Sequence, residues 1–400
     1  MARKRKPFIP SGPQDVTPER LTEILRGRQL LRQARVTGFD TEILGEGEGF
    51  LGTIVRFKLV YERPEEGAPA TVIGKFPTGS GPNRGMAQVG GLYEREVRFY
   101  NDLADRVPIK KPVLYHAVAD PSPKVDLNRV ERWLARIPAW LIRPCVRLLL
   151  WFGKRSRRRS ALFIEDLAPG RPGDQVKGCS LDEALVIVRQ LGAMHAGWWE
   201  RRELDELDWI PPANYLARFS HRMVSKLRGA SFEELAARHP IVRELVAWLD
   251  VHAVEMMDHL AEPPRTLLHG DYRLDNMALL GTGADVRMTL FDWQTMILGR
   301  GPFDLAYFVT GNLTVEESRK AEEPLLHAYH EALVANGVTG YDLEACRRDY
   351  DIAKLAIFYR IHLANDVDLI DMQNARGDAL FDAWIERTCV LIPESWDHLI

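Results

Sequence analysis

The sequence predicts an α+β protein of two lobes, in which a β-rich N-terminal lobe precedes a mainly helical C-terminal lobe. Between residues 41 and 76, glycine-rich turns alternate with runs of alternating apolar residues, a pattern typical of a β-hairpin followed by a further strand. From residue 180 onward, apolar residues recur every three or four positions, which indicates helices packed on a core. The glycine-rich segment 168–178 separates the two patterns and is predicted to be the hinge between the lobes.

Composition is that of an ordinary globular protein, with 400 residues of which 46% are hydrophobic and 27% charged. The 53 Lys and Arg and 56 Asp and Glu give a net charge of −3, so no overall excess of charge favours a nucleic acid partner. The four cysteines contain no C-x-x-C pair, which argues against a zinc site and against a secreted disulfide framework. A cytoplasmic location is therefore expected.

The start of the chain predicts neither an export signal nor an ordered element. Prolines follow the basic residues 1–6 where a signal peptide requires an apolar stretch, and residues 1–16 are expected to be a flexible arm. The most apolar stretch, residues 137–153, is interrupted by two arginines and a proline. It is also shorter than the roughly 20 apolar residues of a membrane span, so no transmembrane segment is predicted.

The N-terminal lobe is assigned to residues 17–167. Its first helix is indicated by Thr17-Pro18-Glu19, an N-cap followed by a proline and an acid in the first turn. The expected elements are a helix from residue 17 to about 32, a hairpin within 41–60 closed off by a turn at 62–69, a strand over 70–76, a helix over 91–103 and a strand over 161–164.

The C-terminal lobe is assigned to residues 168–400 and is expected to carry the catalytic loop and the acceptor site. Two capping boxes, Ser180 to Glu183 and Thr314 to Glu317, mark the beginnings of helices. The expected helices cover 181–194, 214–228, 232–259, 315–334, 343–365 and 377–391.

Two acids and an amide follow apolar strands in this lobe. One strand runs into His-Gly-Asp-Tyr-Arg-Leu-Asp-Asn, which contains Asp271 and Asn276, and a second strand runs into Asp292-Trp-Gln. Phosphoryl transfer requires magnesium to neutralise phosphate charge and a carboxylate that orients the attacking hydroxyl. Asp271 is predicted to be the catalytic base, and Asn276 and Asp292 to be the magnesium ligands, because magnesium prefers hard oxygen ligands.

His-Gly-Asp-x-x-x-x-Asn followed by an apolar residue and Asp-Trp-Gln resembles the catalytic loop and metal site of the aminoglycoside phosphotransferase and choline kinase-like superfamily, especially its ecdysteroid kinase-like branch. The resemblance implies a protein-kinase-like two-lobed fold that uses ATP and Mg²⁺. It also implies that Gly47 and Gly49 lie in a loop that covers the nucleotide. By the same resemblance, Lys75 holds the α- and β-phosphates, Glu96 orients Lys75, and the connector containing Glu165 and Leu167 meets the adenine.

The sequence departs from eukaryotic protein kinases at three motifs. Gly270 replaces the arginine of His-Arg-Asp, Trp293-Gln294 replaces Phe-Gly, and only eleven residues separate Asp292 from Asp304, which leaves no room for a peptide-docking segment. The predicted function is therefore phosphorylation of a hydroxyl group of a small molecule, such as an aminoglycoside, a steroid-like compound or another alcohol. The alternative is a catalytically silent pseudokinase that acts as a ligand-binding or scaffold protein.

Three further residues near these motifs are interpreted as structural. His195 is expected to be a packed core histidine, and His269 to brace the catalytic loop. Asp304 is expected to cap its helix or brace the catalytic loop rather than bind metal.

Residues 133–159 form a basic insertion in the N-terminal lobe, combining an apolar run with Lys and Arg. A basic amphipathic segment such as 143–159 can lie on an anionic membrane. A solvated helix and loop is the alternative interpretation.

Overall fold

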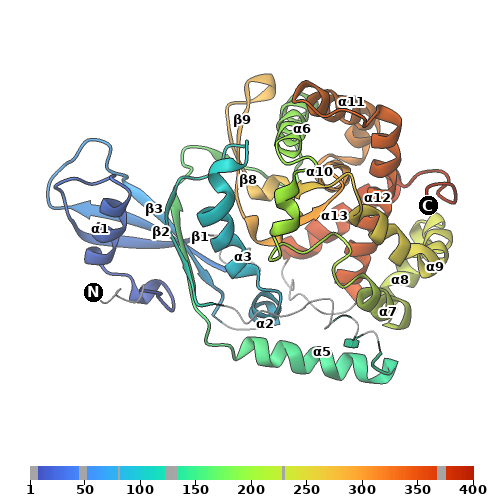
Figure 1. Cartoon of the computed structure of the whole chain (residues 1–400), viewed down its shortest axis with the longest axis horizontal. Helices are drawn as coiled ribbons and strands as arrows, with labels where there is room; N and C mark the ends of the chain where they lie inside the picture. The colour runs from blue at the N-terminus through green and yellow to red at the C-terminus, as the bar shows by residue number, and fades with distance from the viewer. Residues whose placement is uncertain are drawn as a thin grey trace.

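The computed structural model describes residues 8–44, 52–79, 82–121, 131, 133, 134, 136–227, 230–366 and 375–400. The predicted α+β class is confirmed, because a β-sheet lobe formed by the first part of the chain adjoins a helical lobe formed by the rest (Figure 1). Gly47 and Gly49, predicted to contact nucleotide, lie outside the described residues.

The N-terminal lobe contains a five-stranded antiparallel sheet in the order β1-β2-β3-β5-β4. Side chains on successive residues of a strand point to opposite faces of the sheet, so one strand can serve two cores. In β5, Phe163 packs against α1 on one face of the sheet. Its neighbours Leu162 and Ile164 pack on the other face, against α3 and the C-terminal lobe. The strands are β1 (Val36–Leu44), β2 (Gly52–Tyr61), β3 (Thr71–Pro77), β4 (Leu114–Ala119) and β5 (Ser160–Glu165).

Four helices accompany this sheet: α1 (Pro18–Gly27), α2 (Pro82–Val89), α3 (Leu92–Arg98) and α5 (Ala139–Lys154). The Thr17 hydroxyl accepts a hydrogen bond from the Arg20 amide, which confirms the predicted N-cap of α1. α3 continues into a π-helical turn over Phe99–Leu103, and the two together fill the predicted helix 91–103. α5 lies outside the sheet and runs below both lobes in Figure 1.

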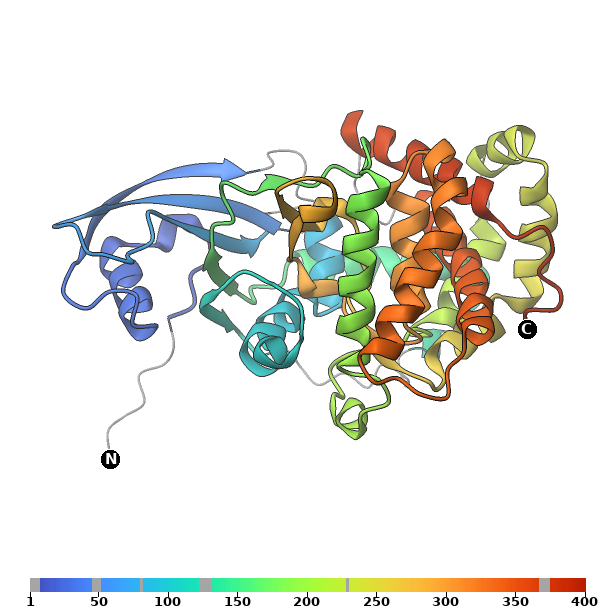
Figure 2. The same cartoon turned by 90° about the horizontal axis from the view of Figure 1, so that it is seen from above.

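The C-terminal lobe is a helical bundle around one large apolar core (Figure 2). Both predicted capping boxes are present, each with the hydroxyl and the glutamate bonded reciprocally to the backbone. The helices are α6 (Leu181–Ala196), α7 (Ala217–Leu227), α8 (Ala230–Arg238), α9 (Ile241–Ala261), α10 (Pro302–Asn312), α11 (Val315–Ala335), α12 (Leu343–Asp366) and α13 (Ala375–Leu391).

Two small antiparallel sheets sit where the lobes meet. One pairs β7 (Thr266–Leu268) with β10 (Ile297–Gly299), and the other joins β6 (Arg171–Pro172), β8 (Met277–Leu280) and β9 (Arg287–Leu290). The predicted hinge, residues 168–178, contains β6 and is tied to the catalytic loop. The Gly173 amide donates to the Met277 carbonyl at 2.9 Å, and the Gln175 amide donates to Asp275 Oδ1 at 2.8 Å.

The bounds of two predicted helices differ most from those in the structure. The predicted helix 232–259 is wrong as a single element, because α8 ends at Arg238 and α9 begins at Ile241. Pro240 lies at the break, and proline disfavours the helical conformation of the residue before it. The first helix ends at Gly27 rather than at about residue 32. Two residues after its end, Gln29 has a positive φ of 60°, which is not a helical conformation.

The sequence analysis missed strand β4. Its residues alternate only weakly in burial. In the structure the strand pairs with β5 from His116 to Ala119, with an irregular register between Leu114 and His116. An edge strand of this kind depends on its partner, which is about 45 residues away, so the local pattern is weak.

Gly85 in α2 faces the backbone of α5, since a Cβ added there would lie 2.4 Å from the Leu150 carbonyl oxygen. Gly85→Ala should therefore force the two helices apart and lower the free energy of unfolding by about 1–3 kcal/mol. Gly27→Ala, at a helix end where a Cβ would meet no atom within 4 Å, is the matched control and should leave stability unchanged or slightly raised. Denaturant unfolding of both variants checks this, and equal midpoints would contradict the close helix packing.

Candidate active site

A buried ion cluster joins the two lobes. Lys75 Nζ on β3 lies 2.8 Å from Glu96 Oε2 on α3 and 2.8 Å from Asp292 Oδ1 in the C-terminal lobe. Burial lowers the pKa of Lys75, but the two carboxylates outweigh burial, so its pKa is raised and the ammonium stays charged. Burial and the nearby Asp292 raise the pKa of Glu96, whereas Lys75 opposes this. Three residues that are separated along the sequence thus meet at one point.

Aromatic packing holds α3 against the loop that carries Asp292. The Trp293 ring stacks on Phe99 with centroids 4.0 Å apart and planes 10° from parallel. In addition, Arg95 donates from Nη1 to the Gln294 carbonyl at 2.9 Å. Burial lowers the pKa of Arg95 to about 10, which still leaves it charged at neutral pH. These contacts position Glu96 and Asp292 relative to each other, because each is adjacent to a packed residue.

Asp271 is surrounded by hydrogen-bond donors. Tyr307 donates its hydroxyl to Oδ1 at 2.5 Å, the Asn276 amide donates to Oδ2 at 2.8 Å, and Arg273 Nε lies 3.1 Å from Oδ1. Burial alone would raise the pKa of Asp271. The positive charge of Arg273 lowers this pKa, and smaller lowering effects come from Tyr307, His269 and Asn276. Together they outweigh burial, so the pKa of Asp271 lies below its ordinary value. The pKa of Tyr307 is raised well above its ordinary value by burial, so the phenol keeps its proton. Asp271 is therefore an ionised acceptor at neutral pH.

The two predicted metal ligands are brought together by the β8–β9 hairpin. The Phe291 amide donates to the Asn276 carbonyl at 3.0 Å, which places Asp292 next to Asn276. The Asn276 side-chain nitrogen donates to the Asp271 backbone and carboxylate, which turns its amide oxygen away from Asp271. Asp292 has a left-handed backbone with φ 67° and ψ 64°, a conformation that non-glycine residues rarely adopt outside functional sites and that Asp and Asn tolerate best.

Asp304 at the start of α10 holds the catalytic loop. Its two carboxylate oxygens accept hydrogen bonds from the His269 amide at 2.6 Å and the Gly270 amide at 2.9 Å, and the side chain is fully buried. The prediction that Asp304 braces this loop is confirmed. His195 is fully buried between Tyr329 and Asp304, which confirms it as a core histidine, and His269 Nε2 bonds to the Phe291 carbonyl, which confirms its bracing role.

Of the two residues predicted to contact adenine, Glu165 is the last residue of β5 and Leu167 lies on the connector that follows. The Glu165 amide donates to the Val113 carbonyl, and its carboxylate accepts from the Val113 amide at 3.1 Å. The Leu167 carbonyl accepts from the Gly170 amide in a turn. Between them, Asp166 forms an ion pair with Arg56 at 2.6 Å, which fastens the connector to β2. Contact of this connector with adenine stays a prediction.

Arg273 and Tyr307 are site residues that the sequence analysis did not single out. Arg273 lies between Asp271 and Asn276 in the motif, so a signal existed: a basic residue within the catalytic loop. Tyr307 is one helical turn after Asp304, and residues three apart lie on the same face of a helix. α10 therefore presents Asp304 to the backbone of the loop and Tyr307 to the carboxylate of Asp271.

Residues 150–338 match the model of the ecdysteroid kinase-like family. Over this span the chain is similar to that family. The family resemblance predicted from the motifs is thereby confirmed, and the matched residues include Asp271, Asn276, Asp292, Asp304 and Tyr307.

Solved structures similar to this chain include three small-molecule kinases and phosphotransferases. The amicoumacin kinase hAmiN, solved with AMP-PNP and Ca²⁺, is 12% identical over 92% of each chain with a TM-score of 0.45. The ethanolamine kinase of Plasmodium vivax is 8% identical over 92% of this chain and 86% of its own, with a TM-score of 0.48. Macrolide 2'-phosphotransferase type I is 11% identical over 94% and 97%, with a TM-score of 0.45. No curated protein sequence matches the chain.

Replacing Asp304 by alanine would leave the buried amides of His269 and Gly270 without an acceptor. The free energy of unfolding should fall by about 2–5 kcal/mol, since each unpaired buried donor costs about 1–3 kcal/mol. Asp102→Ala, which removes an exposed partner of Arg98 at 3.6 Å, is the matched control and should change stability by less than about 1 kcal/mol. Denaturant unfolding measures both, and similar losses in the two variants would contradict a bracing role for Asp304.

Proposed function

We propose that the protein is an ATP- and magnesium-dependent phosphotransferase that phosphorylates a hydroxyl group of a small molecule. The observation that carries the proposal is the meeting of Lys75, Glu96 and Asp292, because a lysine fixed by a glutamate beside a metal-binding aspartate is the arrangement that positions a nucleoside triphosphate. Asp271 and Asn276 belong to the adjoining loop. The ecdysteroid kinase-like match supports the same reaction class.

The residues present fit a magnesium-bound nucleotide. Asn276 and Asp292 offer two hard oxygens next to each other, and the ammonium of Lys75 lies within 2.8 Å of Asp292. Within the described part of the chain, no three His, Cys, Asp or Glu side chains gather as a metal-ligand set. Magnesium usually takes one or two protein ligands and completes its shell with phosphate oxygens and water, so a carboxylate and an amide oxygen are sufficient protein ligands. Bound magnesium would neutralise the charge of the phosphates.

Asp271 would orient the acceptor hydroxyl and accept its proton. The lowered pKa keeps Asp271 ionised at neutral pH, so it can take this proton without first losing one. Tyr307 donates to Oδ1 and Asn276 donates to Oδ2, so both carboxylate oxygens of Asp271 are held in fixed positions. Arg273, beside Asp271, would hold the loop and place positive charge near the transferred phosphate.

The acceptor proposed first is a bulky, partly apolar alcohol of the steroid-like kind, on the strength of the ecdysteroid kinase-like match. An aminoglycoside is the second acceptor class. The alternative of a silent pseudokinase is disfavoured, because the lysine, the base and the metal aspartate are all present and arranged together.

Binding of magnesium-ATP should raise the melting midpoint of the wild type and leave that of Asp292→Asn unchanged. At a nucleotide concentration about a hundred times the Kd, ligand binding adds about 2.7 kcal/mol to stability. Asn tolerates the left-handed backbone of residue 292, so the variant should fold, and it lacks the charge that magnesium requires. Differential scanning fluorimetry with and without magnesium measures the shift.

Asp271→Asn is the companion variant, because it should keep the nucleotide-induced shift but reduce turnover about 10²–10⁴-fold on any accepted alcohol. ATP hydrolysis or transfer to a panel of alcohols, followed by phosphate release or mass spectrometry, measures turnover. Absence of a shift in the wild type at millimolar nucleotide would favour the pseudokinase.

The pH dependence of kcat/KM should report the ionisation of the Asp271 carboxyl group. Arg273 lowers the pKa of Asp271, so the carboxylate is ionised above that lowered pKa and activity is lost only as the pH falls through it. In Arg273→Ala, burial is no longer opposed by the guanidinium, and the acid limb should move up by about 1–3 pH units. Arg273→Lys keeps the positive charge, so it should shift the acid limb of the pH profile less than Arg273→Ala does. An unmoved limb in Arg273→Ala would show that another group sets the profile.

A further inference from the structure

A long segment of the N-terminal lobe contains basic and aromatic residues but no acid. From residue 132 to residue 164 the sequence has nine Lys and Arg, three Trp and no Asp or Glu. The central part of this segment forms α5, a helix of 16 residues. The proposed phosphotransferase chemistry uses none of these residues, so the pattern calls for a separate explanation.

The outward face of α5 is apolar and aromatic. Trp140, Leu148, Trp151 and Phe152 are exposed by 75%, 55%, 47% and 60%. Their spacings of 8, 3 and 1 residues, together with the exposed Arg147 at an intervening position, place them on one face of a helix of 3.6 residues per turn. Large side chains of this kind are normally buried, and a group of them on one exposed face indicates a binding surface.

The opposite face of α5 is packed firmly on both lobes. A Cβ at Gly153 would lie 2.4 Å from the Gly85 carbonyl oxygen, so the backbones of α5 and α2 are nearly in contact. Ile142 is 1% exposed and packs with Phe219 of α7 in the C-terminal lobe. Arg222 of α7 also donates to the Ile137 carbonyl at 2.7 Å. The helix is thus held by its inner face, and its apolar outer face points to solvent.

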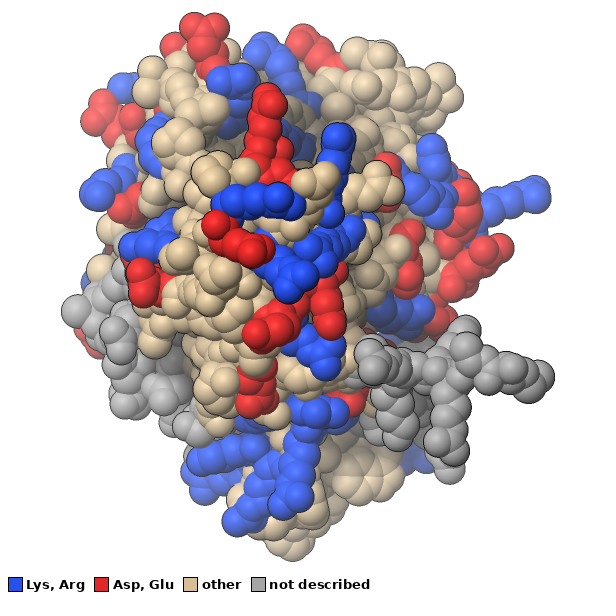
Figure 3. All heavy atoms as spheres, turned by 90° about the vertical axis from the view of Figure 1, so that its left-hand side faces the viewer, with Lys and Arg blue, Asp and Glu red and all other residues tan. Residues whose placement is uncertain are grey.

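Basic side chains accompany this outer face. Arg147, Lys154, Arg155 and Arg157 are all exposed, and the Arg155 guanidinium lies 3.6 Å from the centre of the Trp151 ring. In the space-filling view, the lower end of the molecule, where α5 lies in Figure 1, shows blue and uncharged atoms without red (Figure 3).

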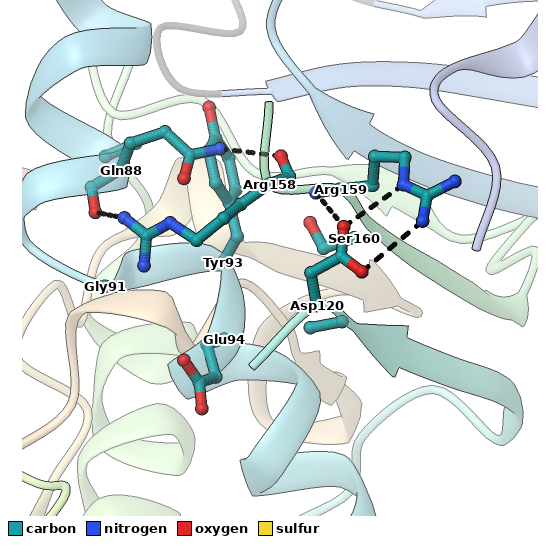
Figure 4. A pocket seen from close by; sticks show the side chains of 10 residues that line it. Gln88, Gly91, Tyr93, Glu94, Asp120, Arg158, Arg159 and Ser160 are labelled. Atoms are coloured by element: carbon teal, nitrogen blue, oxygen red, sulfur yellow. Dashed lines mark hydrogen bonds and ion pairs between the residues drawn. The ribbon is translucent and has the colours of Figure 1, made fainter. Parts of the chain in front are cut away.

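The next two arginines differ, because each is bonded to another residue of the N-terminal lobe. Around a small pocket between α2, α3 and the β4–β5 edge, Arg158 is bonded to the backbone of Gln88, and Arg159 forms an ion pair with Asp120 at 3.1 Å (Figure 4). Among the basic residues 154–159, Lys154, Arg155 and Arg157 are therefore the ones that accompany the exposed aromatic side chains of α5.

We propose that α5 docks the protein on an anionic lipid bilayer, lying in the plane of the interface with Trp140, Trp151 and Phe152 inserted among the headgroups. The charge pattern favours this partner, since basic residues near a membrane surface are attracted to anionic lipids and tryptophan prefers the headgroup region. Within the described ranges, none of the helices combines the length and hydropathy that a span requires. Helix α5 has 16 residues, an apolar outer face and a basic last turn, and these features fit a position in the plane of the interface.

Flotation with vesicles tests the proposal and needs no catalytic step, so its result does not depend on the proposed kinase activity. The wild type should bind phosphatidylcholine–phosphatidylserine vesicles at low ionic strength, bind phosphatidylcholine vesicles much less, and be released by salt. Arg155→Gln/Arg157→Gln should weaken binding about thirtyfold, since each basic residue near the surface contributes about 1 kcal/mol. Trp140→Ala/Trp151→Ala should abolish detectable flotation.

The matched control is Arg287→Gln/Arg319→Gln, which changes the net charge equally. These exposed residues lie on β9 and α11, at the end of the molecule opposite to α5 in Figure 1, and the control should bind like the wild type. Failure of the wild type to bind, equal binding to both vesicle types, equal weakening of the control, or normal binding of the tryptophan variant would each overturn the proposal. Self-association through this face without vesicle binding, measured by light scattering, would also overturn it.

Discussion

The buried cluster of Lys75, Glu96 and Asp292 is the interaction on which the arrangement of the site depends. Each carboxylate lies 2.8 Å from the same ammonium, and the three residues come from β3, α3 and the loop after β9. Burying these charges separately would be costly, so the cluster is stable only when the two lobes are in register. Packing supplies that register, because Trp293 stacks on Phe99 beside Asp292 and Glu96. The loop that carries Asp292 and helix α3 therefore form one unit, although they belong to different lobes.

A second set of contacts, from helix α10, fixes the loop that carries Asp271. Helix α10 contributes Asp304 to the amides of His269 and Gly270 and, one turn later, Tyr307 to the carboxylate of Asp271. Gly270 has φ of 77°, and a Cβ there would lie 2.3 Å from the Thr295 carbonyl oxygen, so the loop also passes close to the segment after Asp292. The predicted base and metal ligands are thus positioned by buried contacts. Their geometry does not rely on exposed side chains, which would cost entropy to hold in place.

Helix α5 serves a different purpose from these elements. Its inner face is fixed by the close approach of Gly153 to Gly85 and by Ile142, whereas its outer face carries exposed tryptophans and arginines. A helix that only filled space would present polar residues to solvent. Because α5 packs on α2 and touches α7, a surface bound to it would hold both lobes at one orientation to that surface.

The sequence alone determined what depends on neighbouring residues. Caps at Thr17, Ser180 and Thr314, helical periods, and the spacing of Asp271, Asn276 and Asp292 are local patterns, and they predicted the fold class and most of the elements. Only the tertiary structure decided which side chains share a site. Arg273 and Tyr307 were missed because their role depends on their distance to Asp271 in the folded chain. The break before Ile241 was missed because the helical period of apolar residues continues on both sides of one proline. Strand β4 was missed because its partner strand is remote in the sequence. Local propensity is read from a few adjacent residues, whereas the free energy of buried charges and strand pairs depends on segments that only folding brings together.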